Sequence, residues 1–311
     1  MMTLIVAICG PTAVGKTAFA IQAARALNGE IVSCDSMQLY QYMDIGSAKP
    51  TAEEQAQAVH HLVDIIDPAG EFSVAGYQKL ARNAIADISG RGKLPIIAGG
   101  TGLYLNSILY DMDFSAPPAK DGTRDALYAI AENEGPEALH RRLAEADPEA
   151  AARIHPNNVK KVVRALEAAE AGEKVKDFAT QLRPSEDVDP VLVGLSRDRA
   201  ELYDRIDRRV DILMDTGLLA EVEGLLARGL TEADISMKGI GYKELIGYLN
   251  GEYDLAEAVR LIKRNTRHLA KRQMTWFKRY KDMKWFNISE YRSEECCAEE
   301  MIKWLQDAIK R

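Results

Sequence analysis

The stretch GPTAVGKT at residues 10–17 directly follows the apolar run LIVAIC at residues 4–9, and together they decide the fold. The stretch matches the phosphate-binding pattern G-x-x-x-x-G-K-[ST], and apolar periodicity predicts a helix directly after it. Loop N–H groups and the helix N-terminus bind phosphate oxygens in this motif, a lysine contacts the terminal phosphate, and a threonine binds Mg²⁺. The sequence thus predicts a bound phosphate compound, without identifying it, on a loop of Gly10, Pro11, Thr12, Ala13, Val14, Gly15, Lys16 and Thr17.

Strands and helices alternate after this loop. Strand-like runs cover residues 29–35, 60–67 and 93–101, and a helical pattern covers residues 77–92. This alternation predicts an α/β fold of the P-loop NTPase type, with a mostly parallel sheet flanked by helices. Ligands of such sheets bind beyond the carboxyl ends of the strands. Since the loop, Asp35 and Thr101 all follow predicted strands, we expect them to meet in one crevice.

The character of the sequence changes near residue 114. Residues 115–186 are rich in Ala, Glu and Arg and show helical spacing without a strand candidate, whereas residues 188–196 again resemble a strand. We therefore expect an all-helical insertion domain at 115–186 within a catalytic core formed by residues 1–114 and 187–311. Long helices are predicted over residues 198–228 and 254–281.

Composition favours a soluble globular protein of the cytoplasm. The chain has 311 residues, 47% hydrophobic and 28% charged, and its four cysteines lack metal-ligand spacing. No apolar run approaches the roughly 20 residues that a membrane span requires. Adjacent histidines at 60 and 61 would point to opposite faces of a strand, so a shared metal ion is not expected. Nothing in the sequence demands a dimer, and a monomer is expected.

Charge is distributed unevenly along the chain. The net charge is −7, yet residues 260–284 hold ten Lys or Arg against one Asp. A basic stripe on an acidic protein indicates local anion binding. A solvated helix face is the alternative.

Two classes of enzyme remain open from the motif alone. An ATPase would normally place an acidic residue at a neighbouring strand end to hold Mg²⁺, but the run at 93–101 ends in glycines. Asp35 is available and is followed by polar and aromatic residues, which suits recognition of a base or another acceptor. A small-molecule or nucleotide kinase is the alternative enzyme. A non-enzymatic RNA-binding module is disfavoured because the loop is complete through Lys16 and Thr17.

Seven stretches together resemble the tRNA dimethylallyltransferase (tRNA isopentenyltransferase) family. No cysteine and histidine finger follows the core, so the chain is similar to the shorter bacterial form. In chain order between residues 10 and 279, the stretches are GPTAVGKT, SCDSMQLYQYMDIGSAKP, HHLVDIIDP, IIAGGTGLYLNSI, RIHPNNVKKVVRALE, MKGIGYKEL and RHLAKRQMTWFKR.

The resemblance implies transfer of a dimethylallyl group from dimethylallyl diphosphate to the exocyclic N6 amine of the adenosine 3′ of the anticodon in tRNA. The loop amides, Lys16 and Mg²⁺ would stabilise the leaving pyrophosphate. Asp35 would take the proton of the adenine amine. The alternatives are that Asp35 contacts a ligand of Mg²⁺ or that it caps a helix. Thr101 would fix the base or its phosphate, unless it only caps a helix.

The remaining site residues also follow from the resemblance. Ser36, Met37 and Gln38 would line the adenine pocket, with paired amide contacts from Gln38. Arg205 would reach the diphosphate, with a surface ion pair as its rival. Helical spacing predicts that Trp276 belongs to the core, with a platform on which bases stack as the alternative. The other residues expected to contact the tRNA anticodon stem-loop are Arg124 in the linker, Lys160, Lys161 and Arg164 in the insertion, and Gly239, Gly241, Lys271, Arg272, Gln273 and Lys278.

Overall fold

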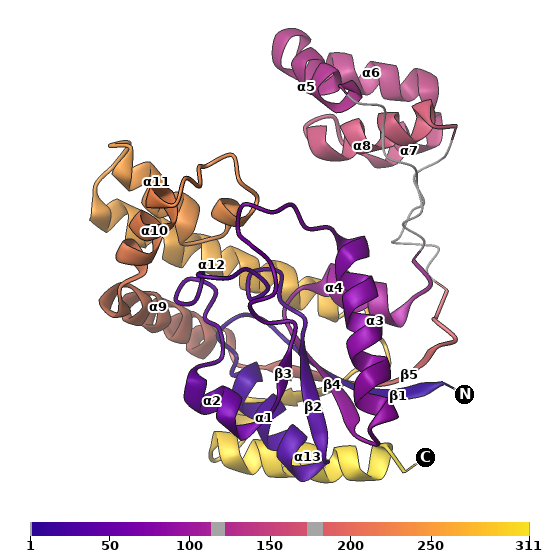
Figure 1. The fold of residues 1–311 in the computed structure, drawn as a ribbon, viewed down its shortest axis with the longest axis vertical. Helices are drawn as coiled ribbons and strands as arrows, with labels where there is room; N and C mark the ends of the chain where they lie inside the picture. The colour runs from indigo at the N-terminus through magenta and orange to yellow at the C-terminus, as the bar shows by residue number, and fades with distance from the viewer. Residues whose placement is uncertain (1, 113–121, 173–182, 311) are drawn as a thin grey trace. The chain divides into compact units, whose positions relative to one another are not determined.

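The computed structural model describes residues 2–112, 122–172 and 183–310 of the chain. It divides the chain into two compact units (Figure 1). The catalytic unit consists of Met1–Leu109 and Ser185–Arg311, and the helical unit consists of Tyr110–Pro184. The predicted boundary at residue 115 lies outside the described residues. No helix in the described ranges is both long and apolar enough to cross a membrane.

One six-stranded sheet organises the catalytic unit, and all its strand pairs are parallel. The predicted parallel α/β fold is thereby confirmed. The first strand is central and buried because its LIVAIC run is apolar on both faces. In the spatial order β3-β2-β4-β1-β5-β6, the strands are β3 (His60–His61), β2 (Gly29–Ser33), β4 (Leu94–Gly99), β1 (Thr3–Cys9), β5 (Val188–Ser196) and β6 (Lys284–Asn287).

Helices cover both faces of this sheet. The crossovers from β1 to β2 and from β3 to β4 run in opposite directions along the sheet, so right-handed connections place their helices, α1 and α3, on opposite faces. The C-terminal helix α13 packs beside α1, and α4 packs beside α3. The helices of this unit are α1 (Lys16–Ala26), α2 (Ala52–Gln57), α3 (Val74–Gly90), α4 (Gly102–Leu109), α9 (Arg199–Thr216), α10 (Leu218–Ala227), α11 (Tyr242–Leu249), α12 (Leu255–Phe277) and α13 (Glu294–Ala308).

The structure corrects two predicted elements and adds others. The predicted strand at 60–67 is wrong beyond His61, because Leu62 and Asp64 adopt positive φ values of 60° and 57° and turn the chain out of the sheet. The helical segment predicted at 198–228 is interrupted at Gly217, whose φ is 111°. The short edge strand β6 and the helices α11 and α13 had not been predicted at all.

The helical unit has an apolar core of its own, built from residues such as Leu127, Leu139 and Val162. Its two chain ends run side by side, since the Asp111 N–H donates to the Arg183 carbonyl at 2.9 Å. In the catalytic unit, the Ser185 N–H likewise donates to the Leu109 carbonyl at 2.9 Å. The helices are α5 (Thr123–Glu134), α6 (Pro136–Ala146), α7 (Pro148–Arg153) and α8 (Val159–Glu170).

Candidate active site

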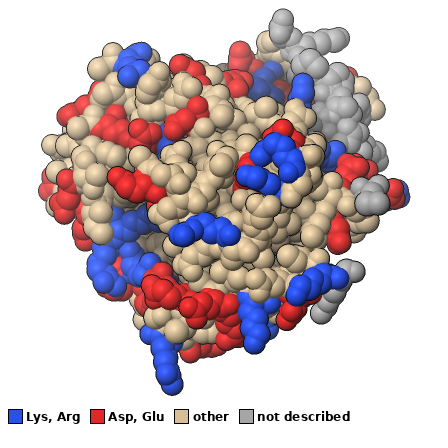
Figure 2. Space-filling view, turned by 60° about the horizontal axis from the view of Figure 1, so that its bottom comes forward, with Lys and Arg blue, Asp and Glu red and all other residues tan. Residues whose placement is uncertain are grey.

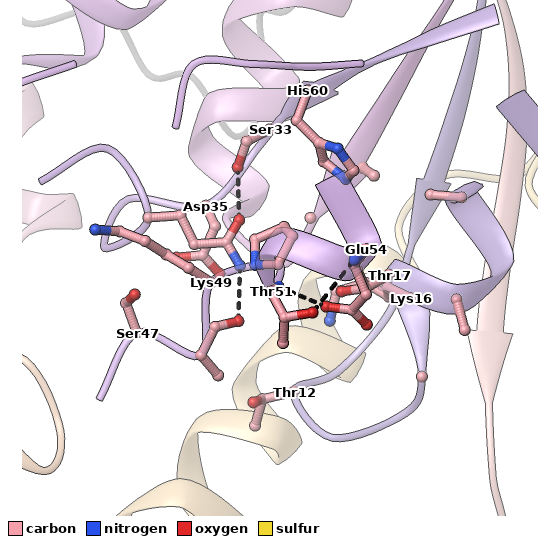
Figure 3. A pocket seen from close by; sticks show the side chains of 18 of the residues that line it. Thr12, Lys16, Thr17, Ser33, Asp35, Ser47, Lys49, Thr51, Glu54 and His60 are labelled. Carbon is pink, nitrogen blue, oxygen red and sulfur yellow. Dashed lines mark hydrogen bonds between the residues drawn. The ribbon is translucent and has the colours of Figure 1, made fainter. Parts of the chain in front are cut away.

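A cavity of about 770 Å³ opens where β1, β2 and β4 end. Lys16 and Thr17 lie at one end of it in Figure 3, and Ser47 and Lys49 lie toward the other. Asp35, which follows β2, and Gly99 at the end of β4 also line the cavity. Residues that are far apart in sequence thus line one open cavity beyond the carboxyl ends of the strands.

The phosphate loop has the backbone geometry that its glycines require. A Cβ atom at Gly10 would lie 2.6 Å from the Leu195 carbonyl oxygen, and Gly15 adopts a φ of 110° just before α1. The Lys16 ammonium donates to the Pro11 carbonyl at 2.8 Å. Burial lowers the pKa of Lys16 to about 8, and the nearby Asp35 charge opposes this shift. The loop therefore holds a buried cation that an anionic ligand would stabilise.

Asp35 is held by a local turn rather than at a helix end. Its Oδ1 accepts the Met37 N–H at 2.9 Å, which is an Asx turn, so the helix-cap alternative is not supported. The negative charge of Asp35 acts on the pKa values of both Lys16 and Arg209, raising each of them against the effect of burial. The carboxylate and both cations line the same cavity.

Thr101 ties the end of β4 to the Asp35 loop. Its hydroxyl oxygen accepts the Ser36 N–H at 3.1 Å, and its own N–H donates to the Cys34 carbonyl at 3.0 Å. The hydroxyl therefore holds the loop that carries Asp35. Thr101 also stands directly before α4, where its carbonyl accepts the Leu105 N–H at 3.2 Å.

The Gln273 amide is positioned inside the protein. Its Oε1 accepts the Thr12 N–H at 2.8 Å, and its Nε2 donates to the Gly100 carbonyl at 3.0 Å. The side chain predicted to contact tRNA thus joins the phosphate loop to the residues after β4. Both polar atoms of this amide are already bonded to the backbone.

Residues of the predicted adenine pocket also make contacts within the protein. Gln38 accepts the Ser33 hydroxyl at 2.9 Å and donates to the Ala48 carbonyl at 3.3 Å. A Cβ atom at Gly239 would lie 2.6 Å from the Met37 methyl group, so this glycine makes room for a protein side chain. Gly241, with a φ of 100°, donates its N–H to the Glu244 carboxylate at 2.8 Å.

Two arginines on α9 reach the cavity. Arg205 contacts the Ala13 carbonyl at 3.2 Å and pairs with Glu294 at 3.0 Å. Arg209, one turn later, had not been predicted. Its guanidinium has no hydrogen-bond or ion-pair partner within the part of the chain that the structure describes, and burial lowers its pKa. The four-residue spacing from Arg205 was the available signal, because it places both side chains on one helix face.

The basic segment is partly neutralised. Figure 2 shows acidic and basic side chains side by side on one face of the molecule. On α12, Lys263 pairs with Asp211 and Arg267 with Asp207. Later in the helix, Lys271 and Arg272 have no carboxylate partner among the described residues. A groove of about 510 Å³, which we call the basic groove, is lined by His268, Lys271, Arg272, Thr275, Trp276 and Arg279.

The prediction that Trp276 belongs to the core is wrong. Phe277, the next residue, is the buried ring, at 1% exposure. Trp276 is half-buried and lies against Gly102, and the Arg279 guanidinium carbon sits 5.2 Å from its ring centroid. An aromatic face therefore belongs to the basic groove. Lys278 is exposed.

In the helical unit, Lys160, Lys161 and Arg164 are exposed on α8. Arg124 lies in α5 and not in a linker, which corrects its predicted position. It pairs with Glu167 of α8 at 2.7 Å and so joins two helices of this unit. A contact between these residues and tRNA stays a prediction.

Comparisons with known proteins agree on one family. The IPP transferase family model matches residues 38–280. The chain is 54% identical to the tRNA dimethylallyltransferase of Alkaliphilus oremlandii (strain OhILAs), over 95% of each chain. It is 46% identical to that of Clostridioides difficile (strain 630), over 98% of each.

Solved structures give the same result. The tRNA isopentenylpyrophosphate transferase of Bacillus halodurans superposes with a TM-score of 0.76 at 42% identity, covering 99% of this chain and 97% of that one. A eukaryotic dimethylallyltransferase acting on tRNA superposes with a TM-score of 0.78 at 28% identity, covering 92% and 74%. Together with the parallel sheet and its phosphate loop, these matches establish that the chain belongs to the IPP transferase family.

Proposed function

We propose that this protein transfers a dimethylallyl group from dimethylallyl diphosphate to the N6 amine of the adenosine 3′ of a tRNA anticodon, releasing pyrophosphate. The observation that carries the proposal is the placement of Asp35 in one cavity with Lys16 and with Arg209, which has no partner among the described residues. This arrangement offers cations for a leaving diphosphate and a carboxylate for an acceptor proton. The alternative, a kinase, is not favoured by the names of the relatives.

At the diphosphate end, the loop N–H groups, Lys16 and Arg209 would bind the phosphate oxygens. Negative charge grows on these oxygens as the bond from carbon to oxygen breaks, so fixed cations stabilise the transition state more than the ground state. The Thr17 hydroxyl, which lines the same end, fits Mg²⁺, an ion that takes few protein ligands besides phosphate oxygens and water. Mg²⁺ would supply further charge neutralisation for the departing pyrophosphate.

At the acceptor end, the adenine nitrogen forms its bond to the allylic carbon while Asp35 accepts the N6 proton. The Asx turn fixes this carboxylate, and Thr101 holds the following residue. A positioned base is a source of rate enhancement because proton removal accompanies bond formation. Adenine must leave its stack in the anticodon loop to reach this depth.

The basic groove would bind the tRNA backbone through Lys271 and Arg272, with Trp276 available to stack on a base. The exposed cations of α8 would contact the stem. One chain contains all of these groups, so the proposal requires no second subunit. It places the enzyme in the cytoplasm, where it would meet its tRNA substrates.

The test is a transfer assay with purified protein, Mg²⁺, labelled dimethylallyl diphosphate and unmodified tRNA. Label should enter tRNA, and changing the adenosine 3′ of the anticodon should abolish this. A parallel reaction with ATP and no RNA tests the kinase alternative, and ATP turnover without label in RNA would refute the proposal.

A further inference from the structure

One wall of the cavity is a loop outside the phosphate-binding motif. We call residues 43–49 the wall loop. Ile45, Ser47, Ala48 and Lys49 line the cavity. In Figure 3, Ser47 and Lys49 lie away from Lys16 and Thr17. The Ala48 carbonyl accepts a hydrogen bond from Gln38, which links this loop to the predicted adenine pocket. The position of the wall loop therefore sets the shape of the cavity.

One carboxylate from a distant helix accepts three consecutive N–H groups of the wall loop. Glu221 of α10 accepts the N–H groups of Asp44 at 2.8 Å, Ile45 at 2.7 Å and Gly46 at 3.0 Å. Consecutive N–H groups that converge in this way form an anion-binding concavity. Here the anion is a side chain 177 residues away from Asp44, and Glu221 itself is not among the residues that line the cavity.

Tyr242 of α11 completes this contact. Its hydroxyl donates to Glu221 at 2.7 Å, and its ring is fully buried. A Cβ atom at Gly46 would lie 2.5 Å from that ring, so the wall loop rests directly on it. Burial and the Glu221 charge raise the pKa of Tyr242, which keeps the hydroxyl a donor. Two helices and the wall loop thus share one hydrogen-bonded centre.

We propose that Glu221 is a positioning residue for the prenyl diphosphate substrate. It holds the wall loop against the cavity without touching the substrate. This inference rests on the proposed function. Loss of the carboxylate would leave N–H groups without an acceptor, and the loop would move to solvate them.

The experiment compares Glu221→Gln with Glu223→Gln, the same change at an exposed position of the same helix. We expect the KM for dimethylallyl diphosphate to rise about tenfold in Glu221→Gln, because the wall loop lines the cavity that would hold this substrate. Glu223→Gln should match the wild type. Glu221→Asp, which keeps the charge on a shorter side chain, should give a smaller rise and replaces Glu221→Gln if that variant does not fold.

Amide hydrogen exchange gives a readout that needs no substrate. Residues 44–46 should exchange faster in Glu221→Gln than in the wild type or in Glu223→Gln. Two results would overturn the inference. One is an unchanged KM in a folded Glu221 variant, whatever its amide exchange. The other is unchanged exchange at residues 44–46. If the wild-type protein transfers no label, both the proposed function and the positioning role are refuted. If the wild type transfers label normally and the KM of Glu221→Gln equals that of the wild type, only the positioning role is refuted.

Discussion

The backbone N–H of Thr12 donates to Oε1 of Gln273 at 2.8 Å, joining the phosphate loop to helix α12. The same side chain bonds to the Gly100 carbonyl, and a Cβ atom at Gly100 would lie 2.4 Å from its nitrogen. Gln273 therefore fills a space shaped for its amide. Neighbouring residues of α12 line the basic groove, so one helix serves both the phosphate loop and the proposed RNA surface.

Replacing Gln273 with Glu should separate its two contacts. The acceptor for Thr12 survives, but a carboxylate oxygen then faces the Gly100 carbonyl oxygen. Because a lost or unsatisfied buried hydrogen bond costs about 1–3 kcal/mol, we expect kcat to fall by about tenfold or more. Steady-state kinetics with tRNA-binding measurements check this. Weaker tRNA binding at normal kcat would show instead that Gln273 contacts RNA.

Asp35→Asn should nearly abolish transfer while leaving the fold intact. The amide retains an oxygen for the Met37 N–H but cannot accept the N6 proton. General-base contributions suggest a loss of about 10²–10⁴ in kcat. Single-turnover rates with labelled substrate measure the step, and circular dichroism controls for folding. Near-normal turnover would remove Asp35 from this role.

Arg209→Gln should weaken binding of the diphosphate substrate. The guanidinium lines the cavity and has no partner in the described residues, so a diphosphate is free to bind it. Charge-assisted hydrogen bonds contribute about 1.5–3 kcal/mol, which corresponds to about a tenfold or greater rise in the Kd for pyrophosphate.

The matched control for Arg209 is Arg208→Gln. Arg208 is the adjacent residue, exposed on α9 and paired there with Asp204. Titration calorimetry of both variants with pyrophosphate decides the question. Equal affinities would show that Arg209 does not bind the diphosphate.

Diphosphate affinity should depend on pH through Lys16, whose pKa is lowered to about 8. Lys16 is cationic below this value and loses its proton above it, so affinity should fall as pH rises through about 8. Lys16→Arg keeps its charge across this range, and the same titration of that variant corrects for ionisation of pyrophosphate itself. Identical profiles for the two proteins would contradict the assignment.

The double change Lys271→Ala and Arg272→Ala should weaken tRNA binding and flatten its salt dependence, since each released phosphate contact lowers the slope by about 0.7–0.9. The control, Lys263→Ala and Arg267→Ala, removes cations that are already paired on α12. Binding measured from low to high salt should separate the two double variants. An equal effect would mean that charge anywhere on α12 suffices.

Patterns within short stretches of sequence were enough to predict the phosphate loop and the main strands beside it. The glycine pattern and the apolar run before it sufficed for the phosphate loop, and β5 occupies the residues predicted for it. The β3 segment was mistaken for a full strand because HHLVDIID is apolar enough, although positive φ at Leu62 and Asp64 bends it away. Helical spacing identified a buried face on α12 but assigned it to Trp276 instead of Phe277, an error of one position.

Contacts across the chain were beyond the reach of the sequence. Glutamine and glutamate side chains carry no sign of their partners, so the bonds of Gln273 to Thr12 and of Glu221 to the wall loop appear only once the sheet has brought distant segments together. Arg209 was hidden for a related reason, because RIDRR contains three arginines and only the fold distinguishes those that line the cavity from the one exposed on the surface.

The bond between Ser185 and Leu109 has a practical consequence. The chain leaves and re-enters the catalytic unit at two residues that are hydrogen-bonded to each other. The helical unit is therefore an insertion that can be replaced as a whole. Its coding segment can be exchanged for a relative's, or for a short linker, without stretching the backbone on either side. A chimera of this kind would keep the catalytic unit of one parent and carry the helical unit of another, with its two junctions at the neighbouring residues Leu109 and Ser185.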